Sequence, residues 1–135
     1  MAFSGALEDR LAIRELMETY NDAVNRRDTD QWAGTWADDA VWDLAGQVIE
    51  GKGPIVGAWE GAMAGFSYVG FGATPGAIEV DGDTATARFF VRETLVSEDG
   101  KIQQLEGRYE DELRKSSSGW VFTKRAYTIL RDTAS

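Results

Sequence analysis

Residues 11–46 read LAIRELMETYNDAVNRRDTDQWAGTWADDAVWDLAG, and this stretch decides the fold. Its first half repeats apolar residues at the spacing of one helix face, which predicts an amphipathic helix over residues 7–24. The side chains on that face are Ile13, Leu16, Met17, Tyr20, Ala23 and Val24. A helix with one apolar face must bury it against another layer of structure.

A second helix is predicted directly after the first. Asp28, with Gln31 three residues later, is typical of an N-cap and its capping partner. The helix would carry Trp32 and Trp36 and would end at Asp38–Asp39. We expect a short strand, AVWDLAG, to follow it.

Beyond this stretch the pattern predicts one more helix and then only strands. Gly53-Pro54 opens the third helix, because proline suits the first helical turn. After Phe66 the period changes to two, with turn residues at regular distances. The expected strands lie near residues 77–80, 84–97, 102–115 and 120–131. We therefore predict an α+β fold in a single domain over residues 1–135, in which an antiparallel meander packs against three helices. The ends, about residues 1–5 and 132–135, are expected to fray.

The composition excludes several kinds of chemistry. The chain has no histidine and no cysteine, so we expect no disulfide, no thiol nucleophile, no metal site and no cofactor. With 14 basic and 23 acidic residues the net charge is −9, which argues against binding nucleic acid. We find no apolar run of membrane-spanning length and no secretory signal, and expect a cytoplasmic protein. Catalysis would depend on carboxylates, phenols, amides and guanidinium groups.

Two inward-facing side chains are candidates for that chemistry. Glu93 alternates with apolar residues on one face of its strand, so its carboxylate faces the core. It could act as a base, or it could sit at the rim or pair with an arginine in a structural bridge. Tyr109 also points inward, where it could serve the site or bond to a backbone carbonyl as a core tyrosine.

The last strand carries apolar residues on both faces. This pattern suggests that the outer face of the sheet is covered as well. Phe90, Trp120 and Phe122 would then form an exposed patch in a monomer. We expect self-association through this face.

The chain resembles the SnoaL-like branch of the nuclear transport factor 2-like superfamily over almost its whole length. The resemblance rests on residues 11–46, on EGKGPI at 50–55, on GRYEDELRK at 107–115 and on SGWVFTKR at 118–125. It implies a cone built from a curved sheet, with three helices on the concave face and an apolar pocket inside. It also implies a homodimer or homotrimer formed through the outer face of the sheet. Members include scytalone dehydratase, hexachlorocyclohexane dehydrochlorinase, ketosteroid isomerase, polyketide cyclases and non-catalytic domains, so the fold alone does not decide the activity.

The catalytic dyad of the most similar members is missing. The dehydratase and the dehydrochlorinase use an aspartate and a histidine, whose positions fall on Asn25 and near Phe71 in this chain. An amide and a phenyl ring cannot accept a proton at neutral pH. The resemblance therefore does not transfer that mechanism.

Other site positions do carry over from the resemblance. Arg125 matches a pocket arginine that stabilises anionic charge, Tyr20 matches an oxyanion-hole tyrosine, and Tyr109 lies near the partner acid of that hole. Trp42 matches a pocket tryptophan. The predicted pocket lining is Asn25, Trp36, Trp42, Trp59, Met63, Phe71, Phe89, Val91 and Tyr127.

These expectations combine into two hypotheses of different classes. In the first, the protein is a cofactor-free lyase, isomerase or cyclase that acts on a small hydrophobic, aromatic or polycyclic ligand. Glu93 is its base, and Tyr20, Tyr109 and Arg125 donate hydrogen bonds to an oxyanion. In the second, the domain binds small molecules or acts as an oligomeric scaffold without catalysis, and Glu93 and Arg125 neutralise each other. A cavity of about 300 Å³ or more between those two residues would favour the enzyme, whereas direct two-pronged contact without a cavity would favour binding or scaffolding.

Overall fold

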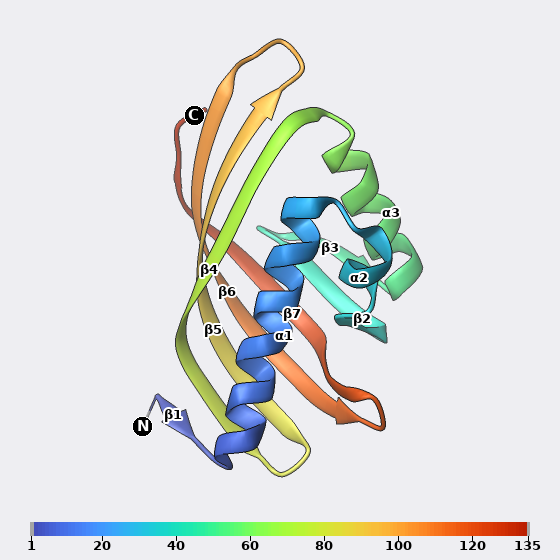
Figure 1. The fold of residues 1–135 in the computed structure, drawn as a ribbon, viewed down its shortest axis with the longest axis vertical. Helices are drawn as coiled ribbons and strands as arrows, with labels where there is room; N and C mark the ends of the chain where they lie inside the picture. Colours follow the sequence, from blue (N-terminus) through green and yellow to red (C-terminus); the bar gives the residue numbers. More distant parts are fainter. Residues whose placement is uncertain (1, 135) are drawn as a thin grey trace.

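A long, curved sheet wraps around the first helix of the protein (Figure 1). The computed structural model describes residues 2–134. The elements are β1 (Phe3–Ser4), α1 (Leu7–Arg26), α2 (Thr29–Ala33), β2 (Trp36–Leu44), β3 (Gln47–Glu50), α3 (Lys52–Met63), β4 (Phe66–Asp81), β5 (Thr84–Ser97), β6 (Ile102–Ser116) and β7 (Gly119–Asp132). Seven strands form one sheet in the order β1-β4-β5-β6-β7-β2-β3. The predicted α+β architecture, a curved sheet with three helices, is confirmed.

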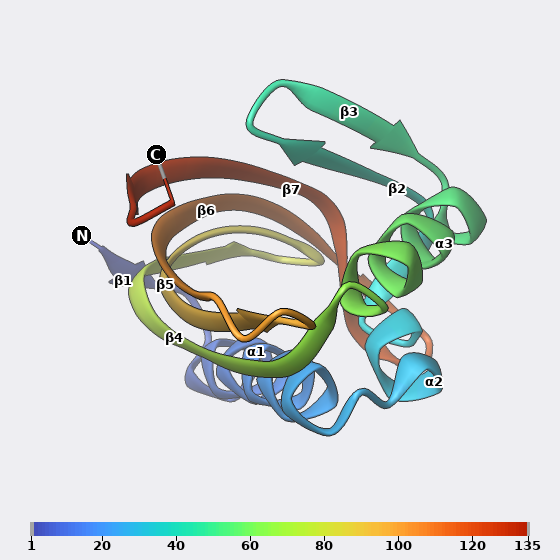
Figure 2. The same ribbon diagram turned by 90° about the horizontal axis from the view of Figure 1, so that it is seen from above.

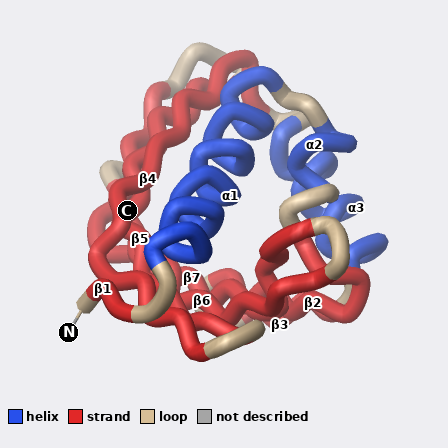
Figure 3. The backbone as a smooth tube through the Cα atoms, turned by 60° about the horizontal axis from the view of Figure 1, so that its bottom comes forward, coloured by secondary structure: helices blue, strands red, loops and turns tan. Residues whose placement is uncertain are grey.

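The sheet is an antiparallel meander with parallel additions. β4, β5, β6 and β7 pair antiparallel in sequence order, as predicted. β2 joins β7 in parallel and β1 joins β4 in parallel, and the sequence pattern did not predict either pair. The curvature leaves a concave side that α1 fills, and α2 and α3 lie beside β2 at one end (Figure 2, Figure 3).

Helix α1 buries the predicted face almost completely. Ile13, Met17, Tyr20, Ala23 and Val24 are each at most 3 % exposed. The helix ends at Arg27, whose φ of 56° is left-handed. The Arg27 guanidinium then donates to the carbonyls of residues 63 and 66, at 3.1 and 2.7 Å. These bonds attach the end of α1 to the start of β4.

Helix α2 begins as predicted and ends earlier. The Asp28 carboxylate accepts a hydrogen bond from the Gln31 backbone N–H at 3.1 Å, which confirms the N-cap. The helix stops at Ala33, so the prediction that it carries Trp36 and ends at Asp38–Asp39 is wrong. Trp36 instead opens β2, where β7 supplies backbone hydrogen bonds that local sequence patterns cannot reveal.

The rows of β5 alternate as predicted. Ala85, Ala87, Phe89, Val91 and Leu95 face the core, and their neighbours on the other face are exposed or only partly buried. β4 is longer than expected, because its first half also pairs with β5 from Phe66 onward. Long paired strands supply the inner wall of the cone.

A β-bulge in β7 overturns the predicted exposed patch. Leu113 of β6 pairs with Phe122 of β7, and Glu112 pairs with Lys124. Thr123 therefore has no register partner on β6 and is the extra residue of the bulge. The extra residue reverses which side chains face inward. Phe122 and Trp120 therefore lie in the core, at 0 and 6 % exposed. Of the expected outer patch, only Phe90 is exposed.

Within the described residues, both ends of the chain form backbone hydrogen bonds, although the sequence predicted that they would fray. Phe3–Ser4 pairs with Ile78 and Glu79 of β4. Near the other end, the Thr133 backbone N–H donates to the Gln104 carbonyl at 3.1 Å. Backbone pairing orders these segments, while residues 1 and 135 lie outside the description. No helix among residues 2–134 has the length and apolar character needed to cross a membrane.

Candidate functional site

An apolar cavity of about 210 Å³ lies inside the cone, between the sheet and the helices. Three of the predicted catalytic residues line it, namely Tyr20, Glu93 and Tyr109. Five of the predicted lining residues do so as well: Trp42, Trp59, Met63, Phe71 and Tyr127. α1, α3 and the strands β2, β4, β5, β6 and β7 each contribute side chains to the wall. Residues from opposite ends of the sequence therefore meet around one cavity.

Glu93 is the one charged side chain among the described residues that line this cavity. It continues the inward row of β5, between its register partners Phe71 on β4 and Leu105 on β6. Within residues 2–134 no group forms a hydrogen bond or an ion pair with its carboxylate. Burial raises the pKa of Glu93 to about 7, because the apolar surroundings disfavour the charged form. The carboxylate can therefore gain or lose a proton near neutral pH.

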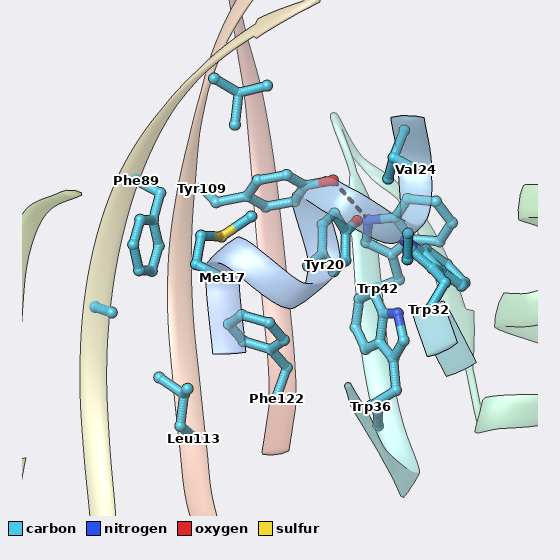
Figure 4. Close-up of a cluster of buried hydrophobic side chains, with 14 of the residues drawn as sticks. Met17, Tyr20, Val24, Trp32, Trp36, Trp42, Phe89, Tyr109, Leu113 and Phe122 are labelled. Atoms are coloured by element: carbon cyan, nitrogen blue, oxygen red, sulfur yellow. Dashed lines mark hydrogen bonds between the residues drawn. The ribbon is translucent and has the colours of Figure 1, made fainter. Parts of the chain in front are cut away.

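Tyr109 also lines the cavity, and a tryptophan holds its hydroxyl in place. Trp42 Nε1 donates a hydrogen bond to the Tyr109 hydroxyl oxygen at 3.0 Å (Figure 4). The predicted bond from Tyr109 to a backbone carbonyl is not formed; the partner is this indole. Burial raises the pKa of Tyr109 well above its ordinary value, so the phenol keeps its proton. That proton is available to an oxygen atom of a ligand.

Tyr127 adds a second phenol on the neighbouring strand. It pairs with Tyr109 across β6 and β7, and the two ring centroids are 4.8 Å apart. The Tyr127 hydroxyl is buried and has no hydrogen-bond partner among the described residues. Burial and the charge of Glu93 both raise the pKa of Tyr127. The sequence placed this residue in the lining but did not indicate a free hydroxyl.

Arg125 does not reach the cavity, contrary to the prediction. Its side chain is fully buried and forms a two-pronged ion pair with Asp111, with Nε–Oδ1 and Nη2–Oδ2 distances of 2.8 and 3.0 Å. The guanidinium carbon lies 3.8 Å from the Tyr109 ring centroid, 4.1 Å from that of Phe122 and 4.6 Å from that of Tyr20. The hypothesis that Glu93 neutralises Arg125 is therefore wrong, because Asp111 does so.

Comparisons with known proteins identify the family of the chain. A SnoaL-like domain profile matches residues 5–126. The chain belongs to the SnoaL-like family.

Relatives of this SnoaL-like protein cover nearly its whole length. An uncharacterised Mycobacterium tuberculosis protein, Rv2910c, is 28 % identical over 128 residues, which are 90 % of this chain and 86 % of that protein. A solved Novosphingobium aromaticivorans structure, provisionally assigned as an aromatic ring hydroxylase, is 32 % identical with a TM-score of 0.88, covering 95 % of this chain and 93 % of that one. The fold also matches a hexachlorocyclohexane dehydrochlorinase, LinA type 2, at 20 % identity and a TM-score of 0.86, covering 94 % and 88 % of the two chains.

Asn25, at the dyad position of the SnoaL-like resemblance, has a structural task here. Its Nδ2 donates to the Phe71 carbonyl at 2.7 Å and to the Asn21 carbonyl at 2.8 Å, and its Oδ1 accepts from the Phe71 backbone N–H at 2.9 Å. The side chain thus pairs with the free edge of β4, which β1 covers only at residues 78–79. The prediction that Asn25 lines the cavity is wrong, since both polar ends of its amide are taken up by backbone.

Three further predicted lining residues of this SnoaL-like domain belong to the core instead. Trp36, Phe89 and Val91 are at most 1 % exposed and do not line the cavity. Trp36 packs against Trp42 and Phe122, with ring centroids 5.6 and 6.1 Å away, and Figure 4 shows these rings together in the core. An inward direction therefore does not by itself make a residue line the cavity, because close packing fills the space around these three side chains.

No metal centre can be assembled from the described part of the chain. Within residues 2–134, no group of three or more carboxylates lies close enough together to hold a metal ion. The candidate site of this SnoaL-like domain therefore consists of one unpaired carboxylate, phenolic hydroxyls and an apolar wall.

Proposed function

We propose that the protein is a cofactor-free acid–base enzyme, a lyase or isomerase, acting on a small, uncharged, hydrophobic ring compound. One observation carries the proposal: Glu93 stands unpaired in an apolar cavity, with a pKa raised to about 7. A base is most effective when its pKa lies near the working pH. An isolated carboxylate in such a place is costly to the fold, which favours a functional reason for its presence.

The proposed reaction begins with the removal of a proton next to a carbonyl group. The Glu93 carboxylate accepts the proton from the ligand carbon, and the electron pair of the broken C–H bond moves to the carbonyl oxygen as an enolate. The Tyr109 hydroxyl lies in the same wall and donates a hydrogen bond to that oxygen. The protonated Glu93 then returns the proton to another ligand atom in an isomerisation, or the enolate expels a leaving group in an elimination.

One structural relative supports the first step of the proposed reaction, the removal of a proton. The fold is shared with a protein named a dehydrochlorinase, and removing HCl from a molecule requires the loss of a proton. The relatives do not assign a substrate to this chain. The size and the apolar lining of the cavity instead support a ring compound of one or two fused rings.

Hydrogen–deuterium exchange tests the proposal without a known substrate. The neutral bicyclic ketone 2-tetralone is incubated with the protein in D2O, and loss of its α-proton signals is followed by proton NMR. We expect the protein to accelerate this exchange, and Glu93→Gln to reduce the protein-catalysed rate by about a hundredfold or more. Glu112→Gln is the matched control, because Glu112 lies exposed on the outer row of β6. Equal exchange with the wild type and with Glu93→Gln would exclude Glu93 as the base.

A non-catalytic binding domain is the alternative. The cavity would also serve that role, since an apolar pocket binds ligands with or without chemistry. In that case 2-tetralone raises the melting temperature while its α-protons exchange at the buffer rate.

Self-association through the outer face of the sheet also remains a proposal. Tyr68 and Phe90 are the exposed aromatic residues that support it, at 56 and 39 % exposed. Sedimentation velocity at micromolar concentration tests it, with a dimer or trimer expected and a clean monomer against it.

A further inference from the structure

We infer that Tyr127 is a further catalytic residue, the hydroxyl that holds the ligand oxygen while Glu93 removes the proton. This inference rests on the proposed function and adds a donor to it. Three observations support it. The buried Tyr127 hydroxyl has no hydrogen-bond partner among the described residues, the packing around the ring fixes its position, and the other hydrogen-bond donors nearby already have partners or are covered by aromatic rings.

The unpaired hydroxyl is the first observation. Buried hydroxyl groups in folded proteins nearly always have a hydrogen-bond partner. Tyr127 lines the cavity, and its buried hydroxyl has no partner among residues 2–134. A polar atom left unpaired on a residue of the cavity wall can bond to an oxygen atom of a ligand that enters the cavity and displaces the packing around the hydroxyl.

The ring of Tyr127 is held by a glycine. At Gly107 on β6, an added Cβ would lie 2.2 Å from the Tyr127 ring and hydroxyl, so this ring occupies the space of the missing side chain. On its other side the ring contacts that of Tyr109, with centroids 4.8 Å apart. The hydroxyl is therefore positioned before any ligand arrives, which is what electrostatic stabilisation of a transition state requires.

The other candidate donors are less free. Arg125 pairs with Asp111 through Nε and Nη2 and is covered by aromatic rings, and although its Nη1 has no partner among the described residues, Arg125 does not line the cavity. The Tyr109 hydroxyl already accepts a bond from Trp42, which limits how it can turn. The ring of Tyr20 is enclosed by other rings of the core, those of Trp32, Trp36, Phe71 and Phe122.

The charges balance during the proposed step. Glu93 begins negative and becomes neutral when it takes the proton, while the negative charge moves to the ligand oxygen. Tyr127 donates a hydrogen bond to that oxygen and keeps its own proton, because burial and the charge of Glu93 raise the pKa of Tyr127. The remaining ionisable groups of the wall, Tyr20 and Tyr109, also have raised pKa values and stay neutral. Binding of a carbonyl group should thus depend on phenolic donors.

Binding of a matched pair of probes tests the inference. The ketone 2-tetralone and the hydrocarbon tetralin share the bicyclic skeleton and differ in the carbonyl oxygen. We expect the wild type to bind the ketone more tightly than the hydrocarbon, and Tyr127→Phe to lower that preference by about tenfold. The infrared C=O stretch of bound 2-tetralone should move to higher frequency in Tyr127→Phe, because a hydrogen bond to the carbonyl is lost. Tyr68→Phe, the same change at an exposed tyrosine, should alter neither quantity.

The melting temperature provides a readout that a purely structural tyrosine would not give. Because the Tyr127 hydroxyl has no partner in the free protein, removing it should raise the melting temperature while carbonyl binding weakens. A wild type without preference for the ketone, or a Tyr127→Phe variant with an unchanged preference and C=O frequency, would overturn the inference.

The two hypotheses fail in different ways. If Glu93→Gln abolishes exchange but Tyr127→Phe leaves the ketone preference intact, the base stands and the role of Tyr127 is wrong. If Glu93→Gln leaves exchange unchanged, the proposed function fails, whatever the binding data show for Tyr127.

Discussion

Replacing Glu93 by glutamine should stabilise the protein, and the gain should grow with pH. Burial raises the pKa of this carboxyl from 4.5 to about 7, so between these pH values the folded state holds a proton that the unfolded state has released. The free energy of unfolding of the wild type therefore falls as the pH rises through this window and levels off above about pH 7. Glutamine has the same shape as glutamate but does not ionise, so the free energy of unfolding of the variant does not fall in this way as the pH rises.

The linkage relation turns the shift into a magnitude. With a pKa of 4.5 in the unfolded state and about 7 in the folded state, the Glu93 carboxyl lowers the free energy of unfolding by about 3 kcal/mol at pH 8.5 and by about 1 kcal/mol at pH 5.5. We therefore expect Glu93→Gln to gain about 2 kcal/mol more, relative to the wild type, at pH 8.5 than at pH 5.5. Any constant effect of the amide cancels in this difference. Asp111, whose pKa burial also raises, titrates in both proteins and cancels too.

Urea denaturation followed by circular dichroism at the two pH values measures the difference. Glu112→Gln is the control, because Glu112 is exposed, and its stability change should be the same at both pH values. A difference below about 0.5 kcal/mol for Glu93→Gln would show that the carboxyl is solvated or paired in the free protein, and the reasoning about the base would then fail.

Three further substitutions test the structural assignments. Asp111→Asn should cost about 3–5 kcal/mol in urea denaturation, because it leaves the buried Arg125 charge without its partner; a loss under 1 kcal/mol would contradict a tightly coupled pair. Asn25→Asp should cost about 1–3 kcal/mol at pH 8, since a carboxylate cannot donate to the Phe71 carbonyl, and an unchanged melting temperature would refute the edge-pairing role. Gly107→Ala should cost about 1–3 kcal/mol and weaken ligand binding, because the new methyl group meets a tyrosine ring; calorimetry showing neither effect would place that ring elsewhere.

Local pattern was enough for most of the framework. The apolar face from Ile13 to Val24, the Asp28 cap and the alternating rows of β5 each follow from contacts within a few residues of sequence. The same alternation directed Glu93 on β5 and Tyr109 on β6 inward, because side-chain direction in a strand follows from its period of two. These features could be predicted because their causes are local.

Long-range pairing decided the rest. Counting back evenly from the 116–119 turn would set Asp111 opposite Lys124, and only the bulge at Thr123 sets it opposite Arg125. The same extra residue turned Phe122 into the core and removed most of the expected outer patch. Trp36 lies in a strand because it pairs with Phe122 of β7, which is far away in the sequence. None of these outcomes has a local signal.

The sequence by itself determined which chemistry this protein lacks, since a chain without histidine or cysteine has neither an imidazole base nor a thiolate. It also determined the α+β framework and the inward direction of Glu93. Only the tertiary structure decided that Glu93 stands unpaired, that Arg125 is neutralised by Asp111, and that Tyr127 offers an unpaired hydroxyl beside an empty cavity. The physical reason is that direction along a strand is a local property, whereas partners and empty space depend on the register and packing of distant segments.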